Sequence, residues 1–455
     1  MADSKPEPEQ ARTRVLALLA RHGWNTTSFQ VLEPGNRYWF GDDACVAYVE
    51  AGHVWVTSGA PIAARERLAE VADAFIAAAR EAGRKAVFFG VEAPFVEAAT
   101  NLVGFKIGEQ PVWDPQTWSN TLRSSRSLRE QLRRARAKNV TVRVVDSAEL
   151  GPGTALREAV TTLVERWLAS RPMAPMGFLV NIEPFAFATH RRYFIAEREG
   201  RVVGFLAAVP IYGRAGWFFE DLLRVPEAPN GTVELLVDFG MTTVAQDGAR
   251  FATLGMVPLA GVGGRLAWIR DHARALYDFG GLDAFKQKLK PVAREPIHVV
   301  HARDIGAFRS VLAVLTAFAR GSLLRFGVAT LARGGPNMLR LLGGLLVPWT
   351  ALLALAAPRL FPSDVVRVAW VAFNALLACL LFVLARHYRL SLGRVVVALA
   401  TIAGVATWAH AIWVVPRLVG PLELIALLLG CLAPACGTTI AIGALRRYRR
   451  LQPLH

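Results

Sequence analysis

The densest group of residues that could do chemistry lies in FFEDLLRVPEAPNGTVELLVDFG, residues 218–240. The pattern predicts a strand ending in Glu220 and Asp221, then a Pro/Asn/Gly turn, and a helix beginning near Thr232. Carboxylates at a strand end could hold an ammonium group or orient a nucleophile, and the helix start would offer free backbone N–H groups. On spacing alone, a turn with a solvated acidic pair explains the same residues.

A second stretch, TLGMVPLAG at 253–261, predicts a strand that exits through Gly255 and Met256. Glycine at such a point is typical of close approach between the backbone and another group. An ordinary strand-to-loop exit accounts for the pattern equally well.

A third stretch, YDFGGLDAFKQKLKP at 277–291, gathers Lys286, Lys288 and Lys290 after a Gly-Gly turn. On a helix, Lys286 and Lys290 would share one face. That face could bind phosphate, or it could be a solvated surface.

A fourth stretch, RSSRSLREQLRRARAK at 123–138, contains six Arg and one Lys and predicts a basic helix. Arg126, Arg129 and Arg133 would form a stripe that matches RNA phosphates or anionic lipid head groups. A solvated surface helix is the alternative interpretation.

Signatures of covalent or metal chemistry are missing from the sequence. It has no G-x-S-x-G, H-E-x-x-H or Walker loop, and its four cysteines lack zinc-ligand spacing. We therefore expect no metal site and no cofactor.

Strand and helix patterns alternate in two series on either side of the basic helix, which predicts a mixed α/β (α+β) fold. The first series has strands at 45–50, 53–59, 86–91 and 105–113, with helices at 63–82 and 94–102. The second has strands at 140–146, 193–199, 201–212, 215–223 and 250–255, with helices at 154–169 and 232–245. Two similar α/β units joined by a helix is the simplest architecture.

The C-terminal third is apolar and basic. Four charge-free runs, at 341–358, 368–385, 395–416 and 424–445, have about the length of membrane-spanning helices. From residue 306 onward the chain has 15 Arg, no Lys and two acids, so most of the net charge of +16 lies here. This distribution is typical of membrane topology signals, not of a genome-binding protein.

The arginines also predict an orientation. Segments before the first run, between the second and third, and after the fourth are rich in Arg, and the other two loops are poorer. Both ends of the helical region should therefore face the cytoplasm. The segment 306–336 has short, Arg-punctuated apolar stretches, which favours an amphipathic helix on the membrane surface. The polar N-terminus has no apolar signal-peptide core, so we expect the first domain to stay in the cytoplasm.

Taken together and in this order, the stretches ERWLASR (165–171), DLLR…APNGTVELL (221–236), LGMVPL (254–259) and YDFGGLDAFKQKLKP (277–291) resemble the synthase domain of the lysyl-phosphatidylglycerol synthases, or multiple peptide resistance factors. The resemblance runs from about Phe29 to His301. It implies tandem N-acetyltransferase-like folds joined by a helix. It also implies transfer of an aminoacyl group, with lysyl among the candidates, from aminoacyl-tRNA to phosphatidylglycerol, and hence a role in antimicrobial peptide resistance.

Such a reaction exchanges one ester for another, so positioning and charge stabilisation could supply most of the rate. The resemblance implies Asp221 and Glu234 near the amino acid's ammonium group, with Arg224 and the lysines at phosphates. The full set of implied site residues is Asp221, Glu234 and Arg224 as catalytic groups, Glu220, Asn230, Gly255, Met256, Lys286 and Lys288 as substrate contacts, and Arg126, Arg129 and Arg133 at tRNA or lipid phosphates.

The chain departs from better-known family members, in which a long membrane region with a lipid flippase precedes the synthase. Here the expected spans are few and follow it, which puts flipping in doubt and favours a simple anchor in a bacterial-type inner membrane. An acetyl-CoA-dependent enzyme is disfavoured, because Pro226 and Pro229 remove backbone donors where a pyrophosphate loop needs them. A peptidoglycan-branching transferase that uses aminoacyl-tRNA and an inactive membrane scaffold with this fold stay open.

These patterns predict seven segments. They are a polar N-terminus with a first helix (1–27), a first acyltransferase-like unit (28–122), the basic connecting helix (123–138), a second, catalytic unit (139–305), the amphipathic segment (306–336), four transmembrane helices (337–445) and a basic tail (446–455).

Overall fold

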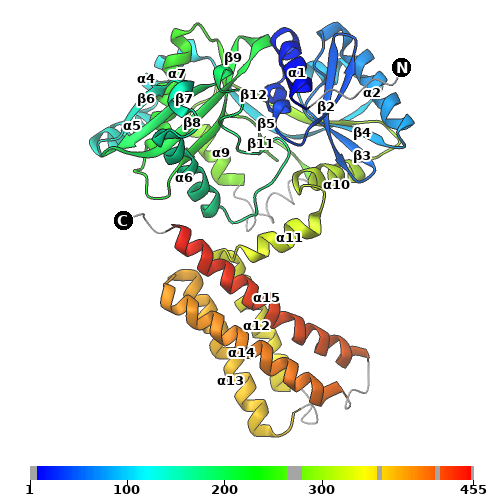
Figure 1. Ribbon diagram of the computed structural model, residues 1–455, viewed down its shortest axis with the longest axis vertical. Coiled ribbons are helices and arrows are strands. Elements are labelled where there is room, and N and C mark those ends of the chain that lie inside the picture. Colours follow the sequence, from blue (N-terminus) through cyan, green and yellow to red (C-terminus); the bar gives the residue numbers. More distant parts are fainter. Residues whose placement is uncertain (1–7, 265–278, 356–360, 416–420, 452–455) are drawn as a thin grey trace. The chain divides into compact units, whose positions relative to one another are not determined.

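The structure is a computed structural model that describes residues 8–264, 279–355, 361–415 and 421–451. The chain divides into two compact units (Figure 1). One comprises residues 1–168 and 175–323, and we call it the sheet unit. The other comprises residues 169–174 and 324–455, and we call it the helical unit.

The sheet unit is built on one twelve-stranded sheet with the order β1-β2-β3-β4-β12-β5-β10-β9-β8-β7-β6, and β11 pairs with β5. The residues before the basic helix form β1 (Arg37–Gly41), which was not predicted, and the four predicted strands β2 (Ala44–Ala51), β3 (Val54–Ser58), β4 (Lys85–Val91) and β5 (Val103–Trp113). The residues after the basic helix form the five predicted strands β6 (Thr141–Val145), β7 (Arg192–Arg198), β8 (Arg201–Ile211), β9 (Gly216–Arg224) and β10 (Phe251–Thr253). They also form β11 (Val257–Pro258) and β12 (Ala293–His301), which were not predicted. The mixed α/β fold expected from the sequence is confirmed.

Helices cover both faces of this sheet. One face, which we call the α7 face, carries α2 (Leu68–Glu81), α3 (Ala93–Ala98), α5 (Arg126–Ala137) and α7 (Thr232–Gln246). The other, the α1 face, carries α1 (Pro8–His22), the 3-10 helix η1 (Thr26–Leu32), α6 (Ala155–Ser170) and α10 (Ala307–Phe318). Among its described residues, this unit also has α4 (Trp118–Ser124) and α9 (Phe279–Lys288).

The last strand differs from its expected place. β12 lies between β4 and β5, with Val299 opposite both Phe89 and Phe105. Residues 293–301 therefore complete the first half of the sheet, although the sequence placed them at the end of the second unit. The two halves join where β10 pairs with β5, so they share one continuous sheet.

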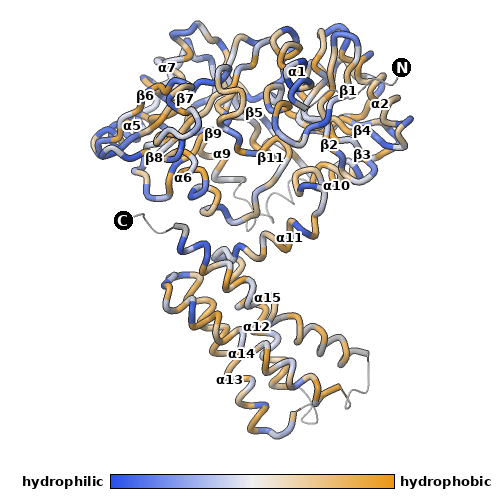
Figure 2. Tube along the Cα trace, viewed as in Figure 1, coloured by the Kyte–Doolittle hydropathy of each residue, from blue (hydrophilic) through white to orange (hydrophobic). Residues whose placement is uncertain are grey.

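The helical unit contains α12 (Pro336–Leu355), α13 (Asp364–Arg386), α14 (Leu390–Val414) and α15 (Pro421–Leu451). By length and apolarity, α12, α13 and α14 could each cross a membrane, and apolar residues dominate them in Figure 2. Three of the expected spans are thus confirmed as candidate spans. The fourth expected run lies within α15 and stays a prediction. The segment 306–336 forms α10 and α11 (Leu323–Ala332), which are bent by 50° relative to each other.

Candidate active site

A β-bulge in β9 turns two adjacent carboxylates toward one face of the sheet. The register with β8 shifts between Phe219 and Asp221, so Glu220 is the extra residue. Phe219 packs in the core on the α7 face, and Leu223 packs on the α1 face. Strand alternation then places Asp221 on the α1 face with Leu223, and the bulge brings Glu220 to the same side.

The sheet also splits beside these carboxylates. β10 pairs with β9 only as far as Thr253 and Phe218, and the chain then turns to β5, where it forms β11. Beyond Phe218, β9 keeps only its β8 neighbour among the described strands. Bulges are over-represented next to active sites, where they re-aim a side chain.

Arg191, directly before β7, forms a buried ion pair with Glu220. Arg191 Nη1 lies 2.6 Å from Glu220 Oε2, and Arg191 Nε donates to the carbonyl of Ala186. The guanidinium also lies over the ring of Phe29, 5.3 Å from its centroid. These contacts hold the cation in one orientation beside the bulge.

Glu33, at the C-terminal end of η1, brings a third carboxylate to this place. Its side chain is buried, and burial together with the charges of Glu220 and Asp221 raises its pKa to about 9. Burial and the charge of Glu220 likewise raise the pKa of Asp221. We call Glu33, Glu220 and Asp221 with Arg191 the acidic cluster.

The acidic cluster has more acceptors than the protein satisfies. Glu33 Oε2, Glu220 Oε1 and Asp221 Oδ2 are buried, and none has a hydrogen-bond partner among the described residues. Buried polar atoms are normally bonded, and an exception asks for an explanation. The cluster has one arginine for three carboxyl groups, and the raised pKa values of Glu33 and Asp221 reflect this shortage of positive charge. It is therefore suited to a ligand that brings positive charge and N–H donors.

The expected partner of Asp221 lies elsewhere. Glu234 is on α7, and its Oε1 accepts from Lys288 Nζ at 2.7 Å. Because α7 covers the face opposite to Asp221, the structure does not bring these two carboxylates together at one ammonium group. Glu234 and Lys288 form an ion pair of their own.

Lys286 is buried, and its amine is fully engaged. Nζ donates to the carbonyls of Leu254, Gly255 and Met256 at 2.7, 2.8 and 3.1 Å. Burial, and the nearby Arg294, lower its pKa to about 7. Lys286 therefore holds the chain where β10 diverges from β9. It does not share a helix face with Lys290, because α9 ends at Lys288.

Gly255 confirms a close approach, although the neighbour is a side chain of the protein. Its φ is +76°, and a Cβ there would lie 2.9 Å from the ring of Phe218. Met256 packs against the core beside α10. Both residues thus shape the split in the sheet.

Arg224 ends β9, and its Nη1 lies 3.3–3.5 Å from the carbonyls of Val225, Pro226 and Ala228. The other guanidinium nitrogens have no hydrogen-bond partner among the described residues. Asn230 is exposed in the turn before α7.

The basic helix α5 is only partly free. Arg129 donates to the carbonyls of Leu122 and Arg123, and Arg133 pairs with Glu130 at 2.8 Å. Arg126 is exposed at the first residue of the helix. The predicted stripe lies on the surface, but two of its three arginines already have partners.

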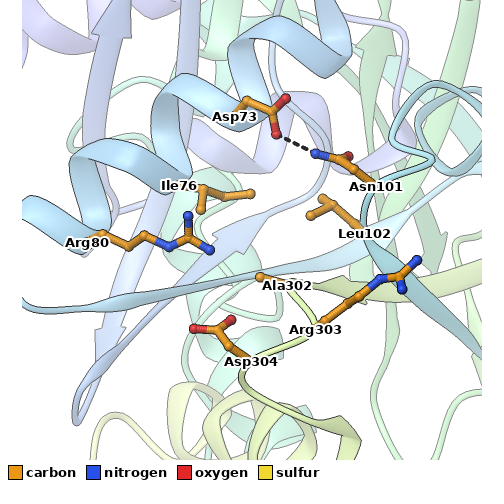
Figure 3. A pocket seen from close by; sticks show the side chains of 8 residues that line it. All are labelled: Asp73, Ile76, Arg80, Asn101, Leu102, Ala302, Arg303 and Asp304. Carbon is orange, nitrogen blue, oxygen red and sulfur yellow. Dashed lines mark hydrogen bonds between the residues drawn. The ribbon is translucent and has the colours of Figure 1, made fainter.

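A separate hollow of about 410 Å³ lies in the first half of the sheet unit and is drawn in Figure 3. It is lined by Asp73, Ile76, Arg80, Asn101, Leu102, Ala302, Arg303 and Asp304. It contains none of the expected site residues, and Asp73 and Asp304 offset the charge of its two arginines. In the described part of the chain, no group of His, Cys, Asp or Glu side chains has the arrangement of a metal site.

Sequence reasoning found Glu220 and Asp221 but missed Arg191 and Glu33. These four residues come from three distant parts of the chain. A pair of adjacent arginines before a strand and a Glu before a Pro-Gly turn carry no motif, so nothing in the sequence pointed to them.

The comparison with protein families decides the relationship. The model described as "Phosphatidylglycerol lysyltransferase, C-terminal" matches residues 16–301, which is more than half of the chain. The chain belongs to this family. The match includes the strands and the acidic cluster, and it ends before α10.

Relatives of this family show the same region. A phosphatidylglycerol lysyltransferase of Bacillus subtilis is 27% identical over 304 residues, which cover 63% of this chain and 34% of the relative. A lysylphosphatidylglycerol biosynthesis bifunctional protein LysX of Nocardia farcinica is 27% identical over 225 residues, covering 46% of this chain and 19% of the relative. The matched region thus spans about a third or less of these relatives.

Two solved structures share the fold of the sheet unit. The C-terminal domain of a putative lysylphosphatidylglycerol synthetase from Agrobacterium fabrum has a TM-score of 0.61 and 20% identity, and the match covers 70% of this chain and 99% of that one. L-PGS from Bacillus licheniformis has a TM-score of 0.59 and 21% identity, with 72% and 99% covered.

Proposed function

We propose that this family member transfers a lysyl group from aminoacyl-tRNA to phosphatidylglycerol at the cytoplasmic face of a bacterial inner membrane. The observation that carries the proposal is the acidic cluster with its three unpartnered carboxylate oxygens. A lysyl ester presents two ammonium groups, and an ammonium group donates three N–H bonds to acceptors of this kind.

The chemistry needs no covalent intermediate on the protein. A glycerol hydroxyl of phosphatidylglycerol attacks the ester carbonyl carbon, a new C–O bond forms, and the C–O bond to the tRNA ribose breaks. The proton leaves the lipid hydroxyl and ends on the ribose oxygen. Because ester replaces ester, orientation of the two substrates by fixed charges can supply most of the rate.

Each cluster residue has a role in this proposal. Asp221, Glu220 and Glu33 bind the amino acid's ammonium groups, and Arg191 holds Glu220 in place. Lys286 fixes residues 254–256 beside them. Arg224, whose remaining guanidinium nitrogens have no described partner, contacts a phosphate of tRNA or lipid. Arg126 and neighbouring arginines of α5 contact the tRNA backbone.

The helical unit serves as the anchor at the lipid substrate. The Arg-rich segments around its helices support cytoplasmic ends, because basic residues concentrate on that side. A lysyl ester on phosphatidylglycerol adds positive charge to an anionic lipid, so the reaction would change the charge of the membrane surface.

Lipid extracts from cells that express the full chain test the proposal. Mass spectrometry should reveal lysyl-phosphatidylglycerol that is missing from cells with an empty vector and reduced in cells with Asp221→Asn. An unchanged lipidome with altered peptidoglycan cross-bridges would point to the branching reaction, and no change in either would indicate a scaffold.

A further inference from the structure

Helix α10, which lies outside the family match, is an integral part of the sheet unit. Its inner side chains Ala313, Val314 and Ala317 are buried in a core cluster with residues of β3, β4 and β12. The ring of Phe318 contacts the rings of Phe89 and Phe178, with centroids 5.2 and 5.3 Å apart. The helix is therefore fixed to the sheet along one side.

The opposite side of α10 is an apolar stripe open to the surroundings. Phe308, Leu312 and Leu315 follow each other at four- and three-residue spacing, so they lie along one face. Their exposed fractions are 81%, 43% and 50%. Single exposed apolar residues are common, but a stripe on one helix face marks a contact surface.

Charge and chain length indicate what this stripe contacts. Residues 306–333 contain four Arg and neither Asp nor Glu, which suits an anionic lipid surface. Seventeen residues separate Phe318 from α12, the first candidate span, and ten of them form α11. Helical and extended rises limit this tether to about 40 Å, so a bilayer that α12 crosses would lie within that distance of the end of α10.

The helix is nevertheless not half of a broken span. The two helices α10 and α11 are long and apolar enough for one span only when they are taken together, and they are bent by 50° relative to each other. A helix that packs one side against a sheet cannot be surrounded by hydrocarbon. Arg320, just beyond α10, also bonds to Asn181 at 3.2 Å in the sheet unit.

We propose that α10 is a membrane-docking helix that inserts Phe308, Leu312 and Leu315 into the interface of an anionic bilayer. The sheet unit would then rest on the membrane through this surface as well as through its covalent link to the spans. The docked helix would also lie next to the acidic cluster, because Gly177 donates to the carbonyl of Phe318 and the same loop carries Asn181, which bonds to Glu33.

Fluorescence quenching of the full chain in phosphatidylglycerol-containing liposomes tests this surface. Cys379, Cys431 and Cys436 are replaced by Ala, buried Cys45 is kept, and a single Cys at Phe308 or Leu312 carries an environment-sensitive dye. Ser127, exposed on α5, is the matched control site. Lipids carry a quencher either near the head group or near the end of the acyl chain.

The dyes at Phe308 and Leu312 should be quenched about twofold more by the shallow quencher than by the deep one, because interfacial helices insert only about 5–10 Å. The dye at Ser127 should be unaffected by either. Stronger quenching by the deep probe would show a span. If neither quencher affected the dyes at the two α10 positions, the proposal would be overturned. This holds whether the helix face is then exposed to solvent or covered by another protein or a second copy. Each labelled variant must first elute as the parent does, and the readout is independent of catalysis.

Discussion

Arg191 Nη1 lies 2.6 Å from Glu220 Oε2, and the two side chains are only 4% and 6% exposed. Among the described residues of the acidic cluster, Arg191 and Glu220 form the one ion pair. Asp221 and Glu33 lie in the same surroundings without a cation of their own. Arg191 thus compensates the charge of Glu220, and the carboxylate oxygens that have no partner among the described residues are left as acceptors for a ligand.

Asp221→Asn should fold and lose transfer activity. Asn keeps the shape of Asp without its charge, and burial already disfavours the charged form of Asp221 by raising its pKa, so we expect the fold to accept Asn. The ligand's ammonium group, in contrast, loses a charge-assisted bond worth roughly 1.5–3 kcal/mol. We expect a tenfold to hundredfold drop in transfer rate, which is roughly what that loss of free energy corresponds to.

Arg224→Lys, which keeps the positive charge but loses the planar fork, should also slow transfer. Parent rates in both variants would refute this placement of the site.

Arg191→Met should destabilise the protein through the charge that it leaves behind. Removing one partner of a buried ion pair costs about 3–5 kcal/mol. The double variant Arg191→Met with Glu220→Gln removes the orphaned charge and should recover much of the loss. Thermal unfolding of the full chain in detergent measures both. Equal unfolding temperatures for the single and double variants would contradict the buried pair.

Binding of a lysine ester should release a proton from the cluster. With a pKa of about 9, Glu33 is protonated in the empty site at neutral and mildly acidic pH. An ammonium group favours the ionised carboxylate, so the pKa of Glu33 falls on binding and a proton is released. Affinity should therefore rise with pH only over the range in which the ligand's amines stay charged. Calorimetry at about pH 6, where the ligand's amines are charged, should give heats that depend on the buffer's ionisation enthalpy. Glu33→Gln should reduce that dependence, and buffer-independent heats in the parent would argue against the cluster as the ammonium site.

The same group predicts a pH effect on stability. Because the pKa of Glu33 is raised from 4.5 to about 9 in the folded protein, the native state holds a proton that the unfolded chain releases. Stability from this group therefore falls as pH rises between these values. Glu33→Gln should gain stability relative to the parent over this range in thermal unfolding scans. A constant difference between the two curves would mean that Glu33 is not buried as described.

Much of this arrangement could be predicted from local patterns. The strands of the two series and the connecting helix follow from hydrophobic patterns, and three candidate spans follow from long charge-free apolar runs. The carboxylates of β9 stand out beside a turn. Glu33 and Arg191 could not be found in this way, because only the pairing of distant strands brings them to the bulge. The bulge that places Glu220 beside Asp221 depends on the register of β9 with β8. The spacing of residues along the sequence does not reveal it.

Other misplacements have similar causes. The sequence pattern is that of a lysine on a surface helix, yet the amine of Lys286 donates to three carbonyls of a distant segment. Glu234 is close to Asp221 in sequence, but the intervening turn takes the chain to the opposite face of the sheet. β12 joins β4 and β5 through a long-range pairing that strand patterns alone do not specify.

The central claim is tested most directly by transfer with purified components. The full chain in phosphatidylglycerol vesicles is given tRNA charged with labelled lysine, and the label in the lipid fraction is measured over time. We predict that label moves to phosphatidylglycerol, and that Asp221→Asn slows the movement tenfold or more, in line with the loss of one charge-assisted bond. Label that stays on tRNA or appears only as free lysine, with a correctly folded chain, would contradict the proposed function.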